Sequence, residues 1–307
     1  MRWKKLGLVF NANQQTTWMQ AHAYIPTAIQ LDANRVRVFI AVRDSDNIGR
    51  IAWVDVKASD PTRVLAVSSR PALDIGVPGT FDDNGVSPTS VVRDRNGELR
   101  LYYVGWQLTP RVRYLLFTGL AISSDDGETF ARFQQTPVLD RSRTEFLLRS
   151  GAHIICDEGT WKAWYAAGSS TRPSREGLTP AYNLHYAESA DGLSWPMEGK
   201  PALNCSGTDE VGIGRSFIER HGDGFRMWAS IRSLSKHYRI EYAMSANGIE
   251  WTRHGEQDGL TVSDDGWDSE MIGFPSIIDN EHGRFLFYNG NGYGATGFGV
   301  AALVSEQ

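Results

Sequence analysis

The chain has 307 residues, and its formal net charge of −5 argues against a nucleic-acid surface, which needs clustered Lys and Arg. Its two cysteines, Cys156 and Cys205, match neither a disulfide framework nor a metal-ligand spacing. No apolar run approaches the roughly 18 residues of a membrane-spanning helix, and the apolar stretch after the basic N-terminus is too short for a secretory signal. The sequence therefore predicts a soluble cytoplasmic protein without a membrane or nucleic-acid partner.

A loosely repeated phrase occurs five times along the chain. In each copy a polar segment leads into a short apolar strand, and a turn then leads to a second strand. The two strands of the first four copies are expected, in chain order, at 27–31 and 35–42, 89–92 and 99–105, 152–156 and 161–168, and 216–219 and 224–231. In the fifth copy the stretch 267–278 is an acidic loop that runs into a short apolar strand, and the second strand is expected at 284–290. We anchor the copies on Pro26, Pro88, Gly151, Ser216 and Pro275, which lie 59 to 65 residues apart.

A second phrase follows the middle copies, at 121–130, 186–195 and 242–251. Each instance contains an Asp-Gly or Asn-Gly pair, which supplies the positive φ angles of tight hairpin turns, and then an aromatic residue that opens another strand. Each copy is therefore expected to be a unit of four short antiparallel strands. Repeated units of this size predict an all-β fold, a five-bladed β-propeller that forms one domain over residues 1–307.

The last copy lacks its fourth strand, because the chain ends soon after a third strand expected at 297–303. The segment 2–10 resembles the stretches that begin at Trp195 and Trp251, so we expect it to supply the missing strand and to remove an open sheet edge. The stretches 68–87 and 171–181 are expected to be irregular loops.

Ionisable residues precede the anchor in every copy. They are His22 in the first copy, Asp82 and Asp83 in the second, Glu145 in the third, Asp209 and Glu210 in the fourth, and Asp268 and Glu270 in the fifth. In a propeller these leading loops meet around a central channel. Carboxylates that share a cavity separate in pKa, so that one serves as an acid and another as a base or nucleophile. The alternative is that these acids cap turns and bind backbone N–H groups.

Other residues could complete such a pocket. Arg149 and Arg215 lie close to their anchors and can bind carboxylate or phosphate oxygens. Arg43 and Arg232 end second strands at equivalent places, either toward the cavity or in solvent. Trp18, Trp106 and Tyr293 are candidates for stacking on sugar rings, although packing roles are common for such residues. Asn289 opens a Gly-rich segment without a phosphate-loop lysine, which favours a tight loop near the channel over a nucleotide site.

The chain resembles the five-bladed β-propeller glycosidases of glycoside hydrolase families 32, 43, 68 and 130. The resemblance rests on the five copies, on the Ser-x-Asp-Gly-x-x-Trp turn at 189–195 with its Asn counterpart at 245–251, and on the acids ahead of the first strands. The segment 123–130 also looks like the Asp-box of sialidases, with Phe in place of Trp. The chain departs from these families at His22, which stands where they place a catalytic Asp. Some relatives carry a structural calcium ion; the sequence itself indicates no cofactor.

The sequence thus predicts a glycoside hydrolase-like enzyme that acts on a sugar or glycan, with Arg149 and Arg215 suggesting an anionic one. Glu270 or Glu210 is the expected general acid, and Asp83 or Asp82 the base or nucleophile. The predicted substrate-binding residues are His22, Arg43, Trp106, Glu145, Arg149, Arg215, Arg232, Asp268 and Asn289. Two alternatives are a propeller that binds a glycan without chemistry and a sugar-modifying or glycosyl-transfer enzyme of polysaccharide assembly.

Overall fold

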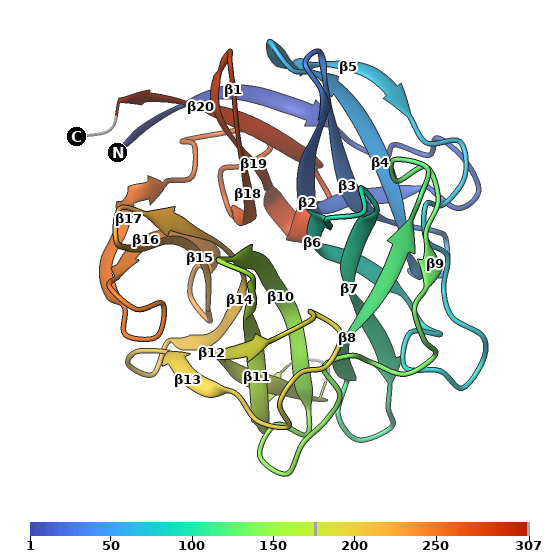
Figure 1. Ribbon diagram of the computed structural model, residues 1–307, viewed down its shortest axis with the longest axis vertical. Coiled ribbons are helices and arrows are strands. Elements are labelled where there is room, and N and C mark those ends of the chain that lie inside the picture. The colour runs from blue at the N-terminus through green and yellow to red at the C-terminus, as the bar shows by residue number, and fades with distance from the viewer. Residues whose placement is uncertain (175–176, 306–307) are drawn as a thin grey trace.

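The computed structural model describes residues 1–174 and 177–305, in which nearly all regular structure is β (Figure 1). The described strands form three sheets, two of four strands and one of twelve. The first small sheet contains β2 (Ala21–Asp32), β3 (Arg35–Arg43), β4 (Gly49–Lys57) and β5 (Asp60–Val67). The second contains β1 (Arg2–Phe10), β20 (Phe298–Ser305), β19 (Gly283–Asn289) and β18 (Gly273–Asn280), and the short helix α1 (Asn291–Gly294) follows β19.

The twelve-stranded sheet consists of three antiparallel groups of four strands. The first group is β6 (Val86–Arg93), β7 (Leu99–Leu108), β8 (Tyr114–Ser123) and β9 (Ala131–Arg132); the second is β10 (Leu148–Asp157), β11 (Thr160–Ser174), β12 (Gly177–Ser189) and β13 (Lys200–Leu203); the third is β14 (Glu210–His221), β15 (Gly224–Ser233), β16 (His237–Ser245) and β17 (Thr252–Leu260). Only short parallel contacts join the groups. β8 meets β10 at two residue pairs, and β12 meets β14 at the single pair Tyr182–Gly212.

The predicted pairing of the N-terminal segment is confirmed. β1 runs antiparallel to β20 and makes the fourth strand of the last sheet, so the two ends of the chain lie side by side (Figure 1). Side chains reinforce this pairing, because Trp3 lies with its ring 6.2 Å from that of Trp228, and Phe10 is buried against Phe298.

The first strands of the five four-stranded groups surround the centre of the molecule (Figure 1). These strands are β2, β6, β10, β14 and β18; each contacts the next, and β18 contacts β2. Each has a break in its ladder register at the anchor position, between Tyr24 and Thr27 in β2 and between Gly273 and Ser276 in β18, for example. Such bulges bend a strand and redirect its side chains. The repeat anchors chosen from the sequence therefore mark a shared structural feature.

The Asp-Gly and Asn-Gly pairs lie in turns as predicted, but these turns are not tight hairpins, since residues 190–199 separate β12 from β13 and residues 246–251 separate β16 from β17. The turns also connect neighbouring groups. Gly192 and Gly248 have φ angles of 71° and 76°, which glycine adopts without steric cost. The carbonyl of Gly192 accepts a hydrogen bond from the Tyr102 hydroxyl at 2.8 Å, and that of Gly248 accepts one from Trp164 Nε1 at 2.6 Å. Tyr102 and Trp164 belong to the preceding groups, so each turn is tied to its neighbour.

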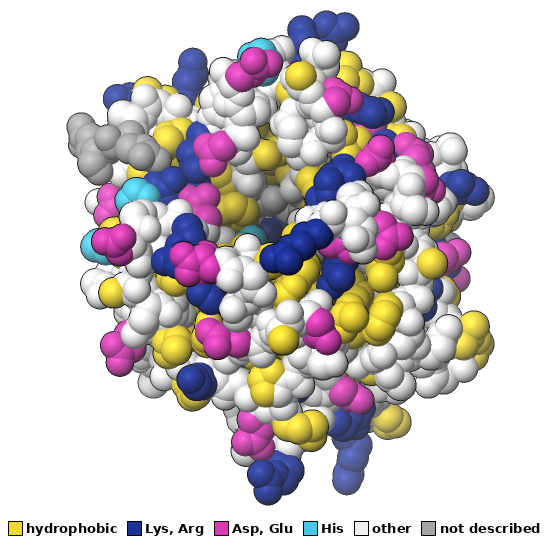
Figure 2. All heavy atoms as spheres, in the orientation of Figure 1, with side chains coloured by type: hydrophobic (Ala, Val, Ile, Leu, Met, Phe, Trp, Pro, Cys, Tyr) yellow, Lys and Arg dark blue, Asp and Glu magenta, His cyan; other side chains and the backbone are white. Residues whose placement is uncertain are grey.

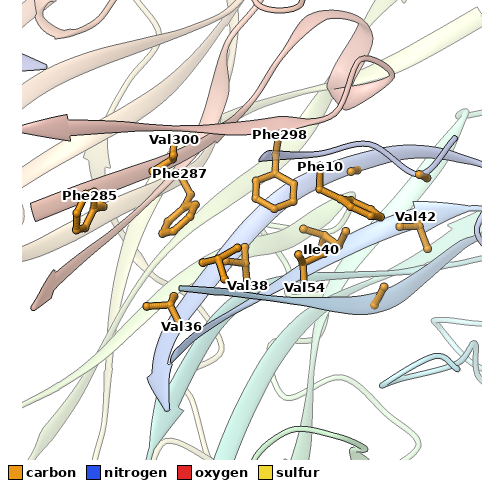
Figure 3. Close-up of a cluster of buried hydrophobic side chains, with 14 of the residues drawn as sticks. Phe10, Val36, Val38, Ile40, Val42, Val54, Phe285, Phe287, Phe298 and Val300 are labelled. Carbon is orange, nitrogen blue, oxygen red and sulfur yellow. The ribbon is translucent and has the colours of Figure 1, made fainter. Parts of the chain in front are cut away.

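Apolar side chains fill the spaces between adjacent groups. Where the last sheet meets the first, β19, β20 and β1 face β3 and β4, as Figure 3 shows. The buried residues at this junction include Phe10, Phe285, Phe287, Phe298 and Val300 on one side and Val36, Val38, Ile40, Val42 and Val54 on the other.

One expected loop is largely regular. The stretch 171–181 was expected to be irregular, but β11 continues to Ser174 and β12 begins at Gly177, with residues 175 and 176 outside the described part. Ladder pairing from Ser170 with Ala181 to Ser174 with Gly177 extends this hairpin. No helix in the described part of the chain is long and apolar enough to cross a membrane.

Candidate functional site

A cavity of about 330 Å³ lies among the first strands and the loops beside them. Its lining includes Tyr24 of β2, Ser150 of β10, Arg215 of β14 and Phe274 of β18. Residues of second and third strands complete the walls. The face seen in Figure 2 is hollowed near its centre, with Lys and Arg side chains around the hollow. A volume of this size is at the lower end of the range for small-molecule sites.

Positive charge dominates this central cavity. Arg43, Arg113, Arg215 and Arg232 line it, whereas Asp46 is its one carboxylate residue among the described residues. Four formal positive charges against one negative charge leave the lining at +3. The sequence predicted a pocket role for Arg43, Arg215 and Arg232, and the structure places all three at the cavity.

Arg215 is a buried cation at this cavity. It is 2% exposed, and it donates hydrogen bonds to the carbonyl oxygens of Pro26 at 2.6 Å and of Phe274 at 2.7 Å, which links β14 to β2 and β18. Burial lowers the pKa of Arg215 to about 9, and its Nε has no hydrogen-bond partner among the described residues. The guanidinium thus joins three first strands by hydrogen bonds to carbonyls rather than by a carboxylate.

Aromatic hydroxyls and rings form much of the remaining wall. The hydroxyl oxygens of Tyr182 and Tyr238 lie 2.5 Å apart, and the ring of Tyr293 lies 6.0 Å from that of Tyr238. Burial raises the pKa of Tyr182 to about 12, although the charge of Arg232 opposes this effect, so the hydroxyl is neutral near pH 7. Trp106 lines the cavity as well, with its indole Nε1 donating to Ser87 Oγ at 3.2 Å. This combination of rings and hydroxyls suits sugar binding.

Three of the predicted acids are tied into the fold outside the central cavity. Asp82 is 1% exposed and accepts hydrogen bonds from the Tyr103 hydroxyl at 2.9 Å and from Arg132 Nε at 2.8 Å. Asp268 is bound in the same way by Tyr288 at 2.8 Å and by Lys5 Nζ at 2.6 Å. In both groups the tyrosine belongs to the second strand and the cation to the fourth.

Glu145 has a related arrangement in the third group, with its tyrosine on the second strand but its cation, Arg149, on the first strand β10. It accepts a hydrogen bond from the Tyr165 hydroxyl at 2.9 Å, and Arg149 Nε lies 2.6 Å from its carboxylate. Arg149 is buried and also donates to the carbonyl of Asp140 at 2.9 Å, so it does not line the central cavity. Acid, tyrosine and cation together fasten the leading loop to the group that follows it.

The remaining candidate acids do not line the central cavity either. Asp83 Oδ2 accepts a hydrogen bond from the Gly79 backbone N–H at 2.8 Å, as the turn-capping alternative expects. Both oxygens of Glu210 bind Arg253, at 2.6 and 2.9 Å. Burial would raise the pKa of Glu210, but the hydrogen bonds from Arg253 hold it below its ordinary value, whereas a general acid needs a raised one. Glu270 is exposed. Among the described residues, no pair of carboxylates lines the central cavity. The catalytic roles expected for these acids stay predictions.

Two predicted binding residues lie close to the cavity without lining it. His22 lies 6.1 Å, ring to ring, from Tyr24, and burial, assisted by the charge of Arg43, lowers its pKa to about 4. His22 is therefore neutral near pH 7. Asn289 is fully buried, and its Oδ1 accepts a hydrogen bond from the Ile25 backbone N–H at 3.3 Å. Trp18, a stacking candidate, packs against the core between the first and last sheets.

The buried hydrogen bonds of Asp82 to Tyr103 and Arg132 give a stability prediction. Asp82→Asn should lower the free energy of unfolding by about 2 kcal/mol, because Arg132 loses its charged partner and an amide N–H₂ replaces one acceptor at a buried site. Urea unfolding measures the change. Glu270→Gln is the matched control, since its side chain is exposed, and should stay within about 0.5 kcal/mol of the unchanged protein. Equal stability of both variants would show that these hydrogen bonds contribute nothing.

A second pocket, of about 290 Å³, lies beside β11, β12 and the start of β14. It brings together two of the predicted acids, Glu145 and Glu210, and adds His185. Nδ1 of His185 lies 2.6 Å from Glu145 Oε1. Tyr182 lines this pocket as well as the central cavity.

Sequence reasoning missed Arg113 and most of the tyrosines at the central cavity. Tyr114, Tyr182 and Tyr238 all belong to third strands, while Arg43, Trp106 and Arg232 belong to second strands. A search for aromatic residues near the start of each third strand would have found two of these tyrosines, since Tyr114 opens β8 and Tyr238 is the second residue of β16.

Among residues 1–174 and 177–305, no three or more His, Cys, Asp or Glu side chains cluster in a way that could hold a metal ion. The described donors that line the central cavity include guanidinium, phenol and indole groups, together with the side chains of Asn47, Asn84 and Ser150, and such groups bind anions and sugars.

The fold is that of glycoside hydrolase-like proteins. A thermostable family-43 glycoside hydrolase superposes with a TM-score of 0.72 at 17% identity, over 95% of this chain and 93% of the other. A glycosyl hydrolase from Bacteroides ovatus gives 0.73 at 12% identity, over 98% of this protein and 93% of that one. A structure from work on the GH130 family of mannoside phosphorylases, described as containing hydrolases that target β-1,2 mannosidic linkages in Candida mannan, gives 0.72 at 13%, over 98% and 93%. The predicted resemblance to glycosidase-like proteins, families 43 and 130 among them, is confirmed at the level of the fold.

In sequence, the protein belongs to the family of the uncharacterized protein Rv1502 of Mycobacterium tuberculosis (strain ATCC 25618 / H37Rv). The two are 34% identical over 303 residues, which cover 99% of each protein. The uncharacterized protein MT1551 of the strain CDC 1551 / Oshkosh is equally similar. No protein-family model matches the sequence.

Proposed function

We propose that the protein is a five-bladed β-propeller that binds a saccharide carrying an anionic group in its central cavity. Five groups of four strands, with first strands that contact one another in a ring from β2 through β18, support this architecture. The weak parallel contacts between β8 and β10 and between β12 and β14 are what neighbouring blades would make where their inner strands begin. Radial repetition of this kind leaves only short, protected sheet edges.

The positive charge of the cavity lining is the main observation in support of an anionic ligand. Four arginines against one carboxylate favour an anion, and the uncompensated charge of buried Arg215 adds to this preference. Guanidinium groups bind carboxylate and phosphate oxygens through paired N–H donors. The tyrosine hydroxyls and the Trp106 ring supply hydrogen bonds and a flat apolar surface for the sugar ring.

Calorimetric titration tests this proposal with glucuronic acid, glucose 1-phosphate and glucose as probes. We expect at least one anionic probe to bind about tenfold or more tightly than glucose. Arg232→Gln should weaken the binding of that probe by about ten- to a hundredfold, because a hydrogen bond to a charged group contributes about 1.5–3 kcal/mol. Arg63→Gln, on the exposed face of the outer strand β5, is the matched control and should bind as the unchanged protein does. Absence of binding by both anionic probes, or equal binding by Arg232→Gln, would contradict the proposal.

An enzyme acting on glycosidic bonds is the second candidate. Its support is the fold shared with glycoside hydrolases together with strained backbone at the cavity, where Ile25 and Phe274 have φ angles of 52° and 56°. Such conformations cost about 1–3 kcal/mol each and gather at functional sites. A mass-spectrometric screen of glycosides, anionic sugars and nucleotide-activated sugars would reveal turnover. If Glu210→Gln and Glu270→Gln both keep full activity on a substrate found in this way, neither residue is the acid.

A further inference from the structure

The second pocket differs in chemistry from the central cavity. It shares Tyr182 with that cavity and is lined largely by hydroxyl, amide and small residues, with Arg172 as its one described arginine. Its two carboxylates already have cationic partners, Glu145 in Arg149 and Glu210 in Arg253. One arginine against two carboxylates gives this lining a formal charge of −1, in contrast to the +3 of the central cavity.

His185 presents one ring nitrogen to this pocket. Burial alone would raise the pKa of Glu145, but the hydrogen bond from His185 and the charge of Arg149 hold it below its ordinary value, so the carboxylate is ionised near pH 7. An ionised carboxylate only accepts hydrogen bonds, and Glu145 Oε1 lies 2.6 Å from His185 Nδ1, so Nδ1 carries a proton. With Nδ1 engaged by Glu145, Nε2 is the ring nitrogen left for the pocket, and the described residues offer it no hydrogen-bond partner.

The surroundings of His185 match a ligand rich in hydroxyl groups. Thr144, Ser169 and Ser170 bring hydroxyls to the lining, each able to donate and to accept. Asn183 Oδ1 is occupied by the Cys205 backbone N–H at 2.9 Å, which orients the amide. A ring nitrogen held in place by Glu145, among groups that both donate and accept, is the pattern that a sugar ring with several hydroxyls can satisfy.

We infer that this pocket is a second saccharide site, which takes a neutral sugar unit and holds one of its hydroxyls on His185 Nε2. Glu145 acts through His185 as a positioning residue that fixes the tautomer of the ring. The inference rests on the proposed function in one respect, that the ligand is a saccharide. It does not depend on the proposed anionic group. The shared wall of Tyr182 places this unit next to the one proposed for the central cavity.

Nuclear magnetic resonance of protein labelled with ¹⁵N in its histidine rings tests the inference. The probes are the methyl α- and β-glycosides of glucose, galactose and mannose. We expect His185, assigned through the spectrum of His185→Phe, to be protonated at Nδ1, and at least one glycoside to shift its Nε2 signal in a saturable way. Glu145→Gln should increase the share of the other tautomer. A ring protonated at Nε2, or no shift with any of the six glycosides, would overturn the inference.

Variants separate this site from the central cavity. His185→Phe should weaken the binding of the neutral glycoside at least about tenfold. Ser170→Leu, which narrows the pocket at an exposed position that takes no part in holding Glu145, should weaken it too, in case His185→Phe disturbs the fold. Arg232→Gln should leave it unchanged. Loss of glucuronic acid binding in Arg232→Gln alone, with neutral binding weakened in His185→Phe and Ser170→Leu but not in Arg232→Gln, would support two sites. If Arg232→Gln abolishes neutral binding while His185→Phe and Ser170→Leu do not, the second site does not exist, whatever becomes of the anion site.

Discussion

A chain without residues 1–10 is expected to be unfolded under conditions in which the full chain is folded. β1 supplies the fourth strand of the last sheet, and its removal exposes the whole edge of β20. The deletion also removes Phe10 from the core at the junction of the first and last sheets and Trp3 from its contact with Trp228. Each large apolar side chain contributes about 1.5–3 kcal/mol.

The expected loss of stability is comparable to the free energy of unfolding of a whole domain. Two such side chains, the strand pairing and the tie between Lys5 and Asp268 together approach the roughly 5–15 kcal/mol that stabilises a typical protein. Circular dichroism during thermal unfolding measures the effect, and Lys4→Ala, on the exposed face of β1, is the control. Adding a peptide of residues 1–10 should restore part of the transition. A truncated protein that melts at the temperature of the full chain would mean that β1 is dispensable.

Features that depend on the local sequence could be predicted. The turns at Gly192 and Gly248 need positive φ, and Asp-Gly or Asn-Gly supplies it. The anchors Pro26, Pro88 and Pro275 lie at bulges, where a missing backbone N–H does not interrupt the ladder. These signals repeat because the four-stranded groups share the same local geometry, a bulge in the first strand and turns with positive φ.

The same repetition explains why the acids looked like a catalytic ring. Asp82 and Asp268 occupy equivalent positions because each binds a tyrosine on its own second strand, Tyr103 and Tyr288. A structural role that recurs in several groups leaves the same trace in the sequence as a shared active site does. The partners Arg132 and Lys5 come from fourth strands far away in the sequence, so nothing local reveals that these carboxylates are engaged.

The tyrosines of the central cavity could not be placed for a different reason. The connections between second and third strands differ in length, with residues 109–113 between β7 and β8 but residues 234–236 between β15 and β16. A shift of one residue turns a strand side chain to the opposite face, so the orientation of Tyr114 and Tyr238 depends on pairing that the sequence does not display. Arg43 and Arg232 were easier to identify because they end second strands at the same place in two groups.

Acid should destabilise the protein through His153, which lies on β10 next to the cavity. His153 is 7% exposed, and its Nε2 lies 2.7 Å from the Ile218 carbonyl oxygen. Burial, assisted by the charge of Arg215, lowers the pKa of His153 to about 3, against 6.5 for the ordinary side chain. The unfolded chain therefore binds a proton more readily, so the stabilising effect of neutral His153 is complete above pH 6.5 and is lost as the pH falls from 6.5 toward 3.

His153→Gln isolates this contribution, since glutamine retains a donor for the Ile218 carbonyl but does not titrate. Between pH 7 and pH 4 the free energy of unfolding of the unchanged protein should fall by about 3 kcal/mol more than that of His153→Gln, at about 1.4 kcal/mol per pH unit below 6.5. Urea titrations at pH 7, 5.5 and 4 measure the difference. His221→Gln, at an exposed position, is the control and should follow the unchanged protein. Parallel pH profiles for His153→Gln and the unchanged protein would show that His153 accepts a proton in the folded state at little cost, and that its burial beside Arg215 does not hold it neutral.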